Sequence, residues 1–583
     1  MKTQNFVKLL SEILERETKI NANELEPSIE TPPDSKLGHF AFPCFNLSKQ
    51  MKKSPAAIAS ELAQKIESNR PSWLGQASAT NAYVNFFLNR AAFANNVLLD
   101  VIESGTDYGA SDEGEGKNIL VEYSSPNIAK HFHIGHLGTT IIGKTLTNIY
   151  RFLGYEVTSI NFFGDWGTQF GKLITAYLKW GSKEEIEKTE IAGLVKLYVK
   201  FHEEADKNPS LNDEARAWVI KMQNGDEEGM SIWKWFCELS MLEYDRIYDR
   251  LQISFDVLSG ESHYNDKMDF VADLISQKNL LKESDGAKIV DLEAFNMPPC
   301  LILKRDGGTL YPTRDIAAAI DRYERFKFDK SLYVTGNEQS LHFAQWIKVL
   351  ELLEFPWAKN IEHIPYGMYL FEAGKMSTRR GDVIKIEDLL DEAVAKTLEI
   401  INEKNPDLPN KNFVAEQVGI GALKFNKLYN SRMKDTMFDW ERILSFDGET
   451  GPYVQYTHAR ACSVLKKSLC ADSRLDFGEL GLALISNPKF DENFLCDDEP
   501  FEVLRIIHDF PSKIKNAAEK HEPFLVARQL VALAQAYNVF YHKYQILAED
   551  EPTRRARLTL TAAVRQVLKT GLELLGINAP VVM

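Results

Sequence analysis

The sequence predicts a multidomain α/β protein whose central domain is built on a parallel sheet. Three observations lead to this prediction. The chain has 583 residues, more than a single hydrophobic core usually organises. A strand–turn–helix–strand order between residues 119 and 163 has the pattern of a βαβ unit. From about residue 381 to the end, apolar residues recur at helical spacing, without the alternation expected of strands.

Residues 1–112 are predicted to form a small α+β domain. Ser54 followed by Pro55 is typical of a helix start, with a serine cap and proline at the first helical position. Residues 81–88 alternate as a strand does. The acidic, glycine-bearing segment 111–116 is expected to link this domain to the next.

The βαβ unit carries the first chemical motif of the chain. A strand at residues 119–123 and a turn at 124–127 precede His133-Ile134-Gly135-His136, and a helix is expected to run on to Gly154. This places the motif between the carboxyl end of a strand and the start of a helix, where anions bind readily. Two imidazoles can donate to phosphates, and the glycine lets the backbone approach a nucleotide.

The rest of the central domain is predicted to span residues 113–380. Residues from about 175 to 290 are expected to form a helical insertion, and the sheet is expected to resume at 300–303 and 332–335. A second motif, Lys375-Met376-Ser377-Thr378-Arg379, offers cations that can bind phosphates. Residues 381–440 are predicted to be a helical connector and 441–583 a helical C-terminal domain.

Composition narrows the class of protein. Hydrophobic residues make up 44% of the chain and charged residues 26%, which is ordinary for a soluble protein. No signal peptide and no run of 18 apolar residues is evident, so we expect a cytoplasmic protein without a membrane span. Six scattered cysteines form no C-x-x-C pair, which argues against structural zinc and against a disulfide scaffold.

Charge alone argues against a nucleic-acid partner, because the formal net charge is −15. The average conceals a basic stretch between Glu551 and Thr570, where Arg554, Arg565 and Lys569 would share one helix face. A solvated helix face is the simpler interpretation of this stretch.

The two motifs, in this order, resemble the paired nucleotide-binding motifs of class I aminoacyl-tRNA synthetases. Further segments narrow the resemblance to the arginyl-tRNA synthetases, and it extends over essentially the whole chain. These segments are residues 122–130, 164–171, 310–318, 339–343, 438–440 and 451–456. The resemblance implies a Rossmann-type catalytic domain with a helical insertion, an N-terminal α+β domain that binds tRNA, and an all-helical anticodon-binding domain.

The function implied is ligation of L-arginine to tRNA(Arg). ATP, with Mg²⁺ on its phosphates, would first give arginyl-adenylate and pyrophosphate, and the arginyl group would then pass to the terminal adenosine of the tRNA. The partners implied are tRNA(Arg), arginine and ATP, without DNA, a membrane or a protein-bound metal, and we expect a monomer.

The resemblance also implies the residues of each site. Arginine would be held by Glu122, Ser125, Asn127, Tyr311, Asp315 and Gln339. Carboxylates and a phenolic oxygen suit the planar fork of a guanidinium, so the charge would come from Asp315 and Glu122. ATP would contact His133, Gly135, His136, Met368, Lys375, Met376, Ser377 and Arg379, with His133, His136, Lys130 and Lys375 as the catalytic groups. In isolation, Tyr311 or Asn127 would be interpreted as a packed tyrosine or a turn asparagine.

Contacts to tRNA are implied at both ends of the chain. Tyr453, Tyr456 and Arg460 are spaced to share one helix face, and aromatic rings beside an arginine suit splayed anticodon bases. By spacing alone, ordinary helix packing is the alternative. The remaining expected contacts are Tyr541 and Met583 for the anticodon loop, and Tyr83 and Asn85 for a D-loop base.

Three positions depart from the family pattern. Thr378 replaces the second lysine of the second motif, and the resemblance suggests that Lys130 supplies the missing charge. His131 stands where the family usually has proline, and Gly138 where it usually has arginine.

Other functions fit this sequence less well. A synthetase for glutamate or cysteine would share both motifs but would lack the context of Tyr311 and Asp315, and the cysteine enzyme would need zinc. An inactive tRNA-binding paralogue would be expected to have lost motif residues. A generic nucleotidyltransferase is usually shorter and needs no helical C-terminal domain.

Overall fold

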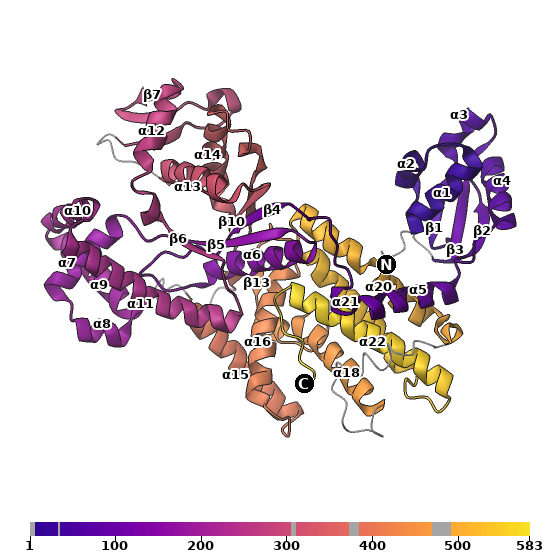
Figure 1. Ribbon diagram of the computed structural model, residues 1–583. Coiled ribbons are helices and arrows are strands. Elements are labelled where there is room, and N and C mark those ends of the chain that lie inside the picture. Colours follow the sequence, from indigo (N-terminus) through magenta and orange to yellow (C-terminus); the bar gives the residue numbers. More distant parts are fainter. Residues whose placement is uncertain (1–5, 33–34, 305–310, 372–383, 469–490) are drawn as a thin grey trace.

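A computed structural model of the chain describes residues 6–32, 35–304, 311–371, 384–468 and 491–583. Figure 1 shows the N-terminal unit and the helical insertion at opposite ends of the molecule, with the parallel sheet between them. The C-terminal helices lie beside the sheet on the side of the N-terminal unit. The second nucleotide motif, residues 375–379, lies outside the described residues.

The N-terminal unit is a three-stranded antiparallel sheet covered by helices. The strands are β1 (Phe40–Pro43), β2 (Leu74–Thr80) and β3 (Tyr83–Leu88), in the order β1-β3-β2. The helices are α1 (Phe6–Thr18), α2 (Ala22–Leu25), α3 (Ser48–Met51) and α4 (Pro55–Ser68). The predicted start of α4 is confirmed, because the Ser54 side chain accepts a hydrogen bond from the Ala57 amide. Val84 and Phe86 on β3 are fully buried in the core of this unit.

A single helix, α5 (Arg90–Ser104), joins this unit to the rest of the chain and packs against the C-terminal helices. Its apolar residues Phe93, Val97 and Val101 belong to the large core shared with those helices. The N-terminal unit is therefore attached through a buried helix rather than through a free linker.

The central sheet has five parallel strands in the order β11-β10-β4-β5-β6, which confirms the predicted parallel sheet. The strands are β4 (Asn118–Glu122), β5 (Glu156–Phe163), β6 (Val257–Gly260), β10 (Lys330–Gly336) and β11 (Ile361–Tyr366). Helix α6 (Ile134–Phe152) joins β4 to β5, as the βαβ pattern predicted. The strand order reverses between β4 and β10, so a crevice is expected at the carboxyl ends of these two strands.

The region between β5 and β10 is more mixed than the sequence indicated. Five helices of the insertion precede β6: α7 (Thr168–Trp180), α8 (Lys183–Thr189), α9 (Ile191–Lys207), α10 (Ser210–Gln223) and α11 (Glu227–Leu251). Beyond β6 come α12 (Met268–Gln277) and a separate antiparallel sheet of β7 (Leu281–Ser284), β8 (Ala287–Val290) and β9 (Cys300–Leu303). The prediction that the parallel sheet resumes at residues 300–303 is therefore wrong, whereas its resumption at 332–335, in β10, is confirmed. A short apolar run shows that a strand forms but not which sheet it joins.

The remaining elements are mainly helical. Helices α13 (Tyr311–Phe326) and α14 (Ser340–Leu352) flank β10, and β12 (Tyr369–Phe371) follows β11. The later helices are α15 (Ile386–Lys404), α16 (Lys411–Leu428), α17 (Trp440–Ile443), α18 (Gly451–Ser468), α20 (Asp498–Lys520), α21 (Phe524–Lys543) and α22 (Glu551–Leu574). The prediction of helices alone after residue 381 is wrong at β13 (Thr436–Phe438), which pairs in parallel with β12. In the part of the chain that the structure describes, no helix is long and apolar enough to cross a membrane.

The basic stretch of α22 is not a freely solvated face. Arg554, Arg565 and Lys569 are all partly buried. The Arg554 guanidinium donates to the carbonyls of Ala548 and Glu549, and so ties the start of the helix to the preceding loop. Arg554 therefore contributes to packing within the C-terminal domain.

Candidate active site

A cavity of about 780 Å³ opens at the carboxyl ends of β4 and β10, where the strand order reverses. It brings together residues from the loops after β4, β5, β6, β10 and β11 and from the start of α13. The predicted site residues that line it are Glu122, Ser125, Asn127, His133, Gly135, His136, Tyr311, Asp315, Gln339 and Met368. One cavity thus contains all six residues expected to bind arginine and the described residues expected to bind ATP, whose roles remain predictions.

The loop after β4 has a strained backbone that is held by hydrogen bonds. Ser124, Ser125 and Ala129 have positive φ angles of 73°, 48° and 61°, a conformation that costs free energy in residues other than glycine. The Ser124 amide donates to the Thr139 hydroxyl over 3.0 Å. The Ser125 amide donates to Asn161 Oδ1 over 3.0 Å. These bonds fix the turn that presents Ser125 and Asn127 to the cavity.

The two histidines of the first motif cap helix α6. His133 Nδ1 accepts from the Gly135 amide, and His136 Nδ1 accepts from the His133 amide, each over 3.1 Å. Because both Nδ1 atoms accept, the proton of each neutral ring is on Nε2. Burial and the charge of Lys130 lower the pKa of His133, and burial, with His133 and Lys130, lowers the pKa of His136 to about 3. Both rings are therefore neutral donors near the helix N-terminus, a position that suits phosphate.

Glu122, one of the two carboxylates expected to face the substrate, already has a counter-ion. Arg322 on α13 lies 2.5 Å from Glu122 Oε2, and both side chains are almost completely buried. Although burial favours the neutral acid, Arg322 favours the carboxylate, and Glu122 in turn raises the pKa of Arg322. The expectation that Glu122 supplies free charge for a ligand must therefore be revised, because Arg322 compensates that charge.

Asp315 is the more available carboxylate. It lies 2.5 Å from His342 Nε2 and is about a quarter exposed at the cavity surface. Tyr311, one helical turn earlier on α13, is 64% exposed, so its hydroxyl is accessible to a ligand. The two residues expected to read a guanidinium are thus neighbours at the mouth of the cavity.

A third acidic residue, Glu261, was not identified from the sequence. It follows β6, lines the cavity and forms a 2.9 Å ion pair with Arg314. Burial raises the pKa of Glu261 to about 7, although Arg314 opposes the shift. Glu261 belongs to no recognisable motif, and its proximity to Asp315 depends on the sheet order, so the sequence contained no signal for it.

Tyr366, the last residue of β11, and Met368, two residues later, also line the cavity. The Tyr366 hydroxyl donates to the Gly135 carbonyl over 3.0 Å. A Cβ atom on Gly138 would lie 2.8 Å from the Tyr366 ring, so at this departure from the family pattern the tyrosine occupies the space beside the glycine. Lys130 is exposed and does not line the cavity, although its charge acts on both histidines.

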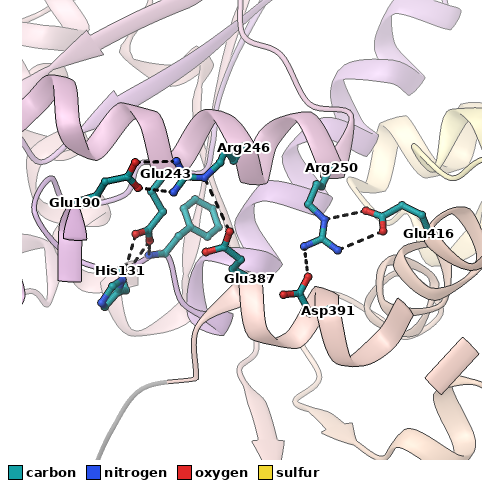
Figure 2. Close-up of polar contacts among 9 residues, drawn as sticks. His131, Glu190, Glu243, Arg246, Arg250, Glu387, Asp391 and Glu416 are labelled. Atoms are coloured by element: carbon teal, nitrogen blue, oxygen red, sulfur yellow. Dashed lines mark hydrogen bonds and ion pairs between the residues drawn. The ribbon is translucent and has the colours of Figure 1, made fainter. Parts of the chain in front are cut away.

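His131, which also departs from the family pattern, contacts the helical insertion (Figure 2). His131 Nδ1 lies 3.3 Å from both carboxylate oxygens of Glu243 on α11. Further along α11, Arg246 pairs with Glu190, and Arg250 pairs with Asp391 on α15 and Glu416 on α16. The chain around the start of α15 is hydrogen-bonded to the segment that carries the first motif. The Ile386 amide donates to the Phe132 carbonyl, and the Ile134 amide donates to the Ile384 carbonyl. Helix α11 thus supports the segment that carries the histidines.

The predicted anticodon contacts form a cluster on the C-terminal domain. The Arg460 guanidinium lies over the rings of Tyr456, at 4.8 Å, and Tyr541, at 5.0 Å. It also donates to Asn538 Oδ1 over 2.6 Å, and Asn538 donates to the Tyr453 hydroxyl. Met583 and Phe446 both pack against the apolar cluster around Ile401 and Val418, and the Phe446 ring contacts Tyr456. The five predicted residues therefore lie within one connected region, with Tyr456 the most accessible of the three residues on α18.

The two residues expected to contact a D-loop base differ in accessibility. Tyr83 and Asn85 share the face of β3 opposite Val84 and Phe86. Tyr83 is partly exposed and contacts the exposed Phe45 ring, but Asn85 is only 4% exposed. Within the described ranges, no three His, Cys, Asp or Glu side chains are grouped so that they could hold a metal ion.

Comparison with known protein families assigns a family to each part of the chain. Residues 98–440 match the model of class I (R) tRNA synthetase catalytic domains. Residues 454–583 match the DALR anticodon-binding domain, and residues 4–88 match the arginyl-tRNA synthetase N-terminal domain. The parallel sheet, the histidine motif and these matches define a class I aminoacyl-tRNA synthetase.

Individual relatives specify the amino acid. The chain is 51% identical to the arginine–tRNA ligase of Alkaliphilus metalliredigens, with 99% of each chain covered. It is 50% identical to that of Halothermothrix orenii, with 98% of each covered. The protein belongs to the arginine–tRNA ligases. The structure of Thermus thermophilus arginyl-tRNA synthetase, 24% identical and aligned over the full length of both chains with a TM-score of 0.79, has the same fold.

Proposed function

We propose that this ligase binds arginine in the acidic part of the cavity and ATP in the part that contains the histidines. The cavity that joins these two parts carries the proposal. Four carboxylates line it, those of Glu122, Glu261, Asp315 and Glu338, and its described lining includes no lysine or arginine. Such a lining favours a cationic ligand.

Asp315 is the proposed partner of the guanidinium, with Tyr311 beside it. Glu122, which is compensated by Arg322, contributes a polar wall rather than net charge. Ser125, Asn127 and Gln339 are proposed to hold the ammonium and carboxylate of arginine. The buried Ser125 hydroxyl has no hydrogen-bond partner within the described residues, which supports a role in binding.

The first step joins the two substrates. An arginine carboxylate oxygen attacks the α-phosphorus of ATP, the bond to the bridging oxygen of the β-phosphate breaks, and pyrophosphate leaves. His133 and His136 donate through Nε2–H to the phosphates, beside Gly135 and Met368. Lys130, Lys375, Met376, Ser377 and Arg379 complete the proposed ATP contacts, with Mg²⁺ on the phosphates. Positioning and stabilisation of charge supply the catalysis, without a protein nucleophile.

In the second step a ribose hydroxyl of the terminal tRNA adenosine attacks the arginyl carbonyl, and AMP leaves. Tyr453, Tyr456, Arg460, Tyr541 and Met583 are proposed to bind the anticodon loop. The stacked Tyr456–Arg460–Tyr541 cluster supports this assignment, because bases stack on such surfaces. Tyr83 is the stronger candidate for a D-loop contact, since Asn85 is only 4% exposed.

The proposed domain division is 1–112, 113–380, 381–440 and 441–583. We further propose a cytoplasmic monomer that holds no zinc of its own. The scattered cysteines support the last point.

ATP–pyrophosphate exchange, measured with each amino acid in the presence and absence of tRNA(Arg), tests the proposal. Exchange should require arginine, and glutamate and cysteine should support none. Exchange with another amino acid would reject the assignment of the acidic pocket.

A further inference from the structure

The wall of the cavity beside the histidine motif depends on Tyr366. This residue ends β11, lines the cavity and bonds through its hydroxyl to the Gly135 carbonyl. Met368, two residues later, lines the cavity as well. The path of the backbone from Pro365 to Met368 therefore sets the shape of the proposed ATP site.

Arg432 holds this backbone on both sides of Tyr366. The residue lies in the loop between α16 and β13. Its guanidinium donates to the Pro365 carbonyl over 2.5 Å, and its own carbonyl accepts from the Gly367 amide over 2.8 Å. One residue thus fixes the positions immediately before and after Tyr366.

The turn that joins α20 to α21 holds Arg432 in place. Its Nε donates to the His521 carbonyl over 3.1 Å, and its amide donates to Glu522 Oε2 over 3.1 Å. The other oxygen of Glu522 accepts from the Ser431 hydroxyl. The Arg432 and Glu522 side chains are only 16% and 15% exposed, so these charged contacts are shielded from solvent.

The same turn also contacts the first part of β11. His521 Nε2 lies 2.8 Å from Glu362 Oε2, and this hydrogen bond lowers the pKa of Glu362 to about 2. This turn of the C-terminal domain therefore contacts β11 directly at Glu362 and indirectly, through Arg432, at Pro365.

Helix α21 connects this turn to the proposed anticodon cluster. It begins at Phe524, two residues after Glu522, and carries Asn538 and Tyr541 near its other end. Asn538 and Tyr541 are contacts of Arg460. At 1.5 Å per residue, the helix spans about 20 Å between Phe524 and Asn538. Its inward residues, among them Leu530 and Tyr537, are fully buried, so it is firmly packed.

We propose that Arg432 and Glu522 are positioning residues through which the C-terminal helices set the Tyr366–Met368 wall of the ATP site. Helix α21 connects the two places, so a tRNA held at the Tyr456–Arg460–Tyr541 cluster acts on the ATP site through this contact. The inference rests on the proposed function, because it requires ATP to bind beside Tyr366 and Met368.

Steady-state pyrophosphate exchange with saturating tRNA(Arg) tests the role of Arg432. Arg432→Ala should raise the KM for ATP about tenfold, as expected for loss of charge-assisted hydrogen bonds. The KM for arginine and the Kd for tRNA(Arg) should each stay within about twofold of wild type, a separation that general destabilisation would not produce. Glu522→Gln should act in the same direction, and the double variant should be no worse than Arg432→Ala, because the two residues act as one unit.

Arg528→Ala is the matched control. Arg528 also lies on α21 and contacts Tyr429 at the end of α16, but no contact of its guanidinium with residues 361–368 is found in the described structure. The KM of the Arg528→Ala variant for ATP should match that of wild type. Arg432→Lys keeps the charge without the fork that reaches two carbonyls, so it should show the same ATP defect even if the alanine variant unfolds.

The outcomes separate the two proposals. If wild type exchanges pyrophosphate with arginine while Arg432→Lys and Glu522→Gln bind ATP normally, this inference is wrong and the proposed function stands. An equal rise in the KM values for ATP and arginine would also overturn it. If wild type shows no arginine-dependent exchange, both proposals fail.

Discussion

Asp315 and Glu122 differ in what already compensates their charge, and this difference predicts different mutant phenotypes. Asp315 pairs with the partly exposed His342, whereas Glu122 is neutralised by buried Arg322. Asp315→Ala should raise the KM for arginine at least about a hundredfold, because a guanidinium would lose its charged partner. The KM for ATP should change little. Aminoacylation kinetics provide the measurement, and a normal KM for arginine would remove Asp315 from the site.

Glu122→Gln is the informative comparison. It should destabilise the protein by leaving Arg322 buried without a counter-ion, a loss of about 3–5 kcal/mol. The main effect should therefore appear in thermal unfolding rather than in selectivity for arginine.

The raised pKa of Glu261 predicts that arginine binding depends on pH. Its folded pKa is raised to about 7 by burial, so the folded state keeps a proton that the unfolded chain loses near pH 4.5. Glu261 therefore favours folding at low pH, and this contribution is lost as the pH rises through about 7. A bound guanidinium favours the carboxylate, so arginine should bind more tightly as the pH rises from about 6 to about 8, with release of a proton.

Isothermal titration calorimetry in buffers of different ionisation enthalpy measures that proton. Glu261→Gln should abolish the release while folding normally. If wild type and Glu261→Gln release the same fraction of a proton, another group is responsible.

At the scale of single residues, motifs predicted the residues that line the cavity but not their counter-ions. The spacing within H-I-G-H is local, and His133 and His136 do lie at the start of a helix. Arg322 on α13 pairs with Glu122 behind the cavity lining, and Glu261, directly after β6, lines the cavity itself. The distance from Glu122 to Arg322 is set by how β4 and α13 pack, which no local pattern encodes.

At the scale of elements, helix α11 acts as a brace between the insertion and α15 (Figure 2). Arg250 is about a quarter exposed and contacts Asp391 and Glu416 on two different helices. Arg250→Ala should lower the free energy of unfolding by about 1–2 kcal/mol, more than an isolated surface pair contributes. Differential scanning fluorimetry measures the change. The control is Arg216→Ala, whose pair with Asp213 is largely exposed, and equal losses for the two variants would show that the brace adds nothing.

The two wrong predictions about strands, at β9 and at β13, have a common cause. β9 and β13 are strands of four and three residues, too short for periodicity to assign their partners. β13 pairs with β12, which lies more than sixty residues earlier in the chain. By contrast, α6 was predictable because nineteen residues supply a full apolar stripe and a cap.

At the scale of the whole molecule, the order of the domains was predictable because each has its own motifs and its own pattern of helices and strands. The contacts between domains were not. Arg432, the turn at His521–Glu522 and β11 come from three distant segments. Their meeting depends on how the C-terminal helices dock beside the sheet, and this packing makes long-range control of the ATP site physically reasonable.

Adenylate formation should depend on bound tRNA, because tRNA on the C-terminal domain favours the conformation that binds ATP productively. Arg460→Ala should therefore slow adenylate formation about tenfold at saturating tRNA, although Arg460 contacts Asn538, Tyr456 and Tyr541 and does not line the cavity. Binding of tRNA should also weaken steeply with salt.

Single-turnover adenylate formation with and without tRNA(Arg) measures the effect. If α21 transmits it, Arg460→Ala and Arg432→Ala should be non-additive in this assay, because each breaks the same connection at a different end. Fully additive losses would place the coupling on another route. Full exchange with arginine and ATP alone would leave the C-terminal domain as a docking module, since a site already formed without tRNA has nothing to gain from its binding.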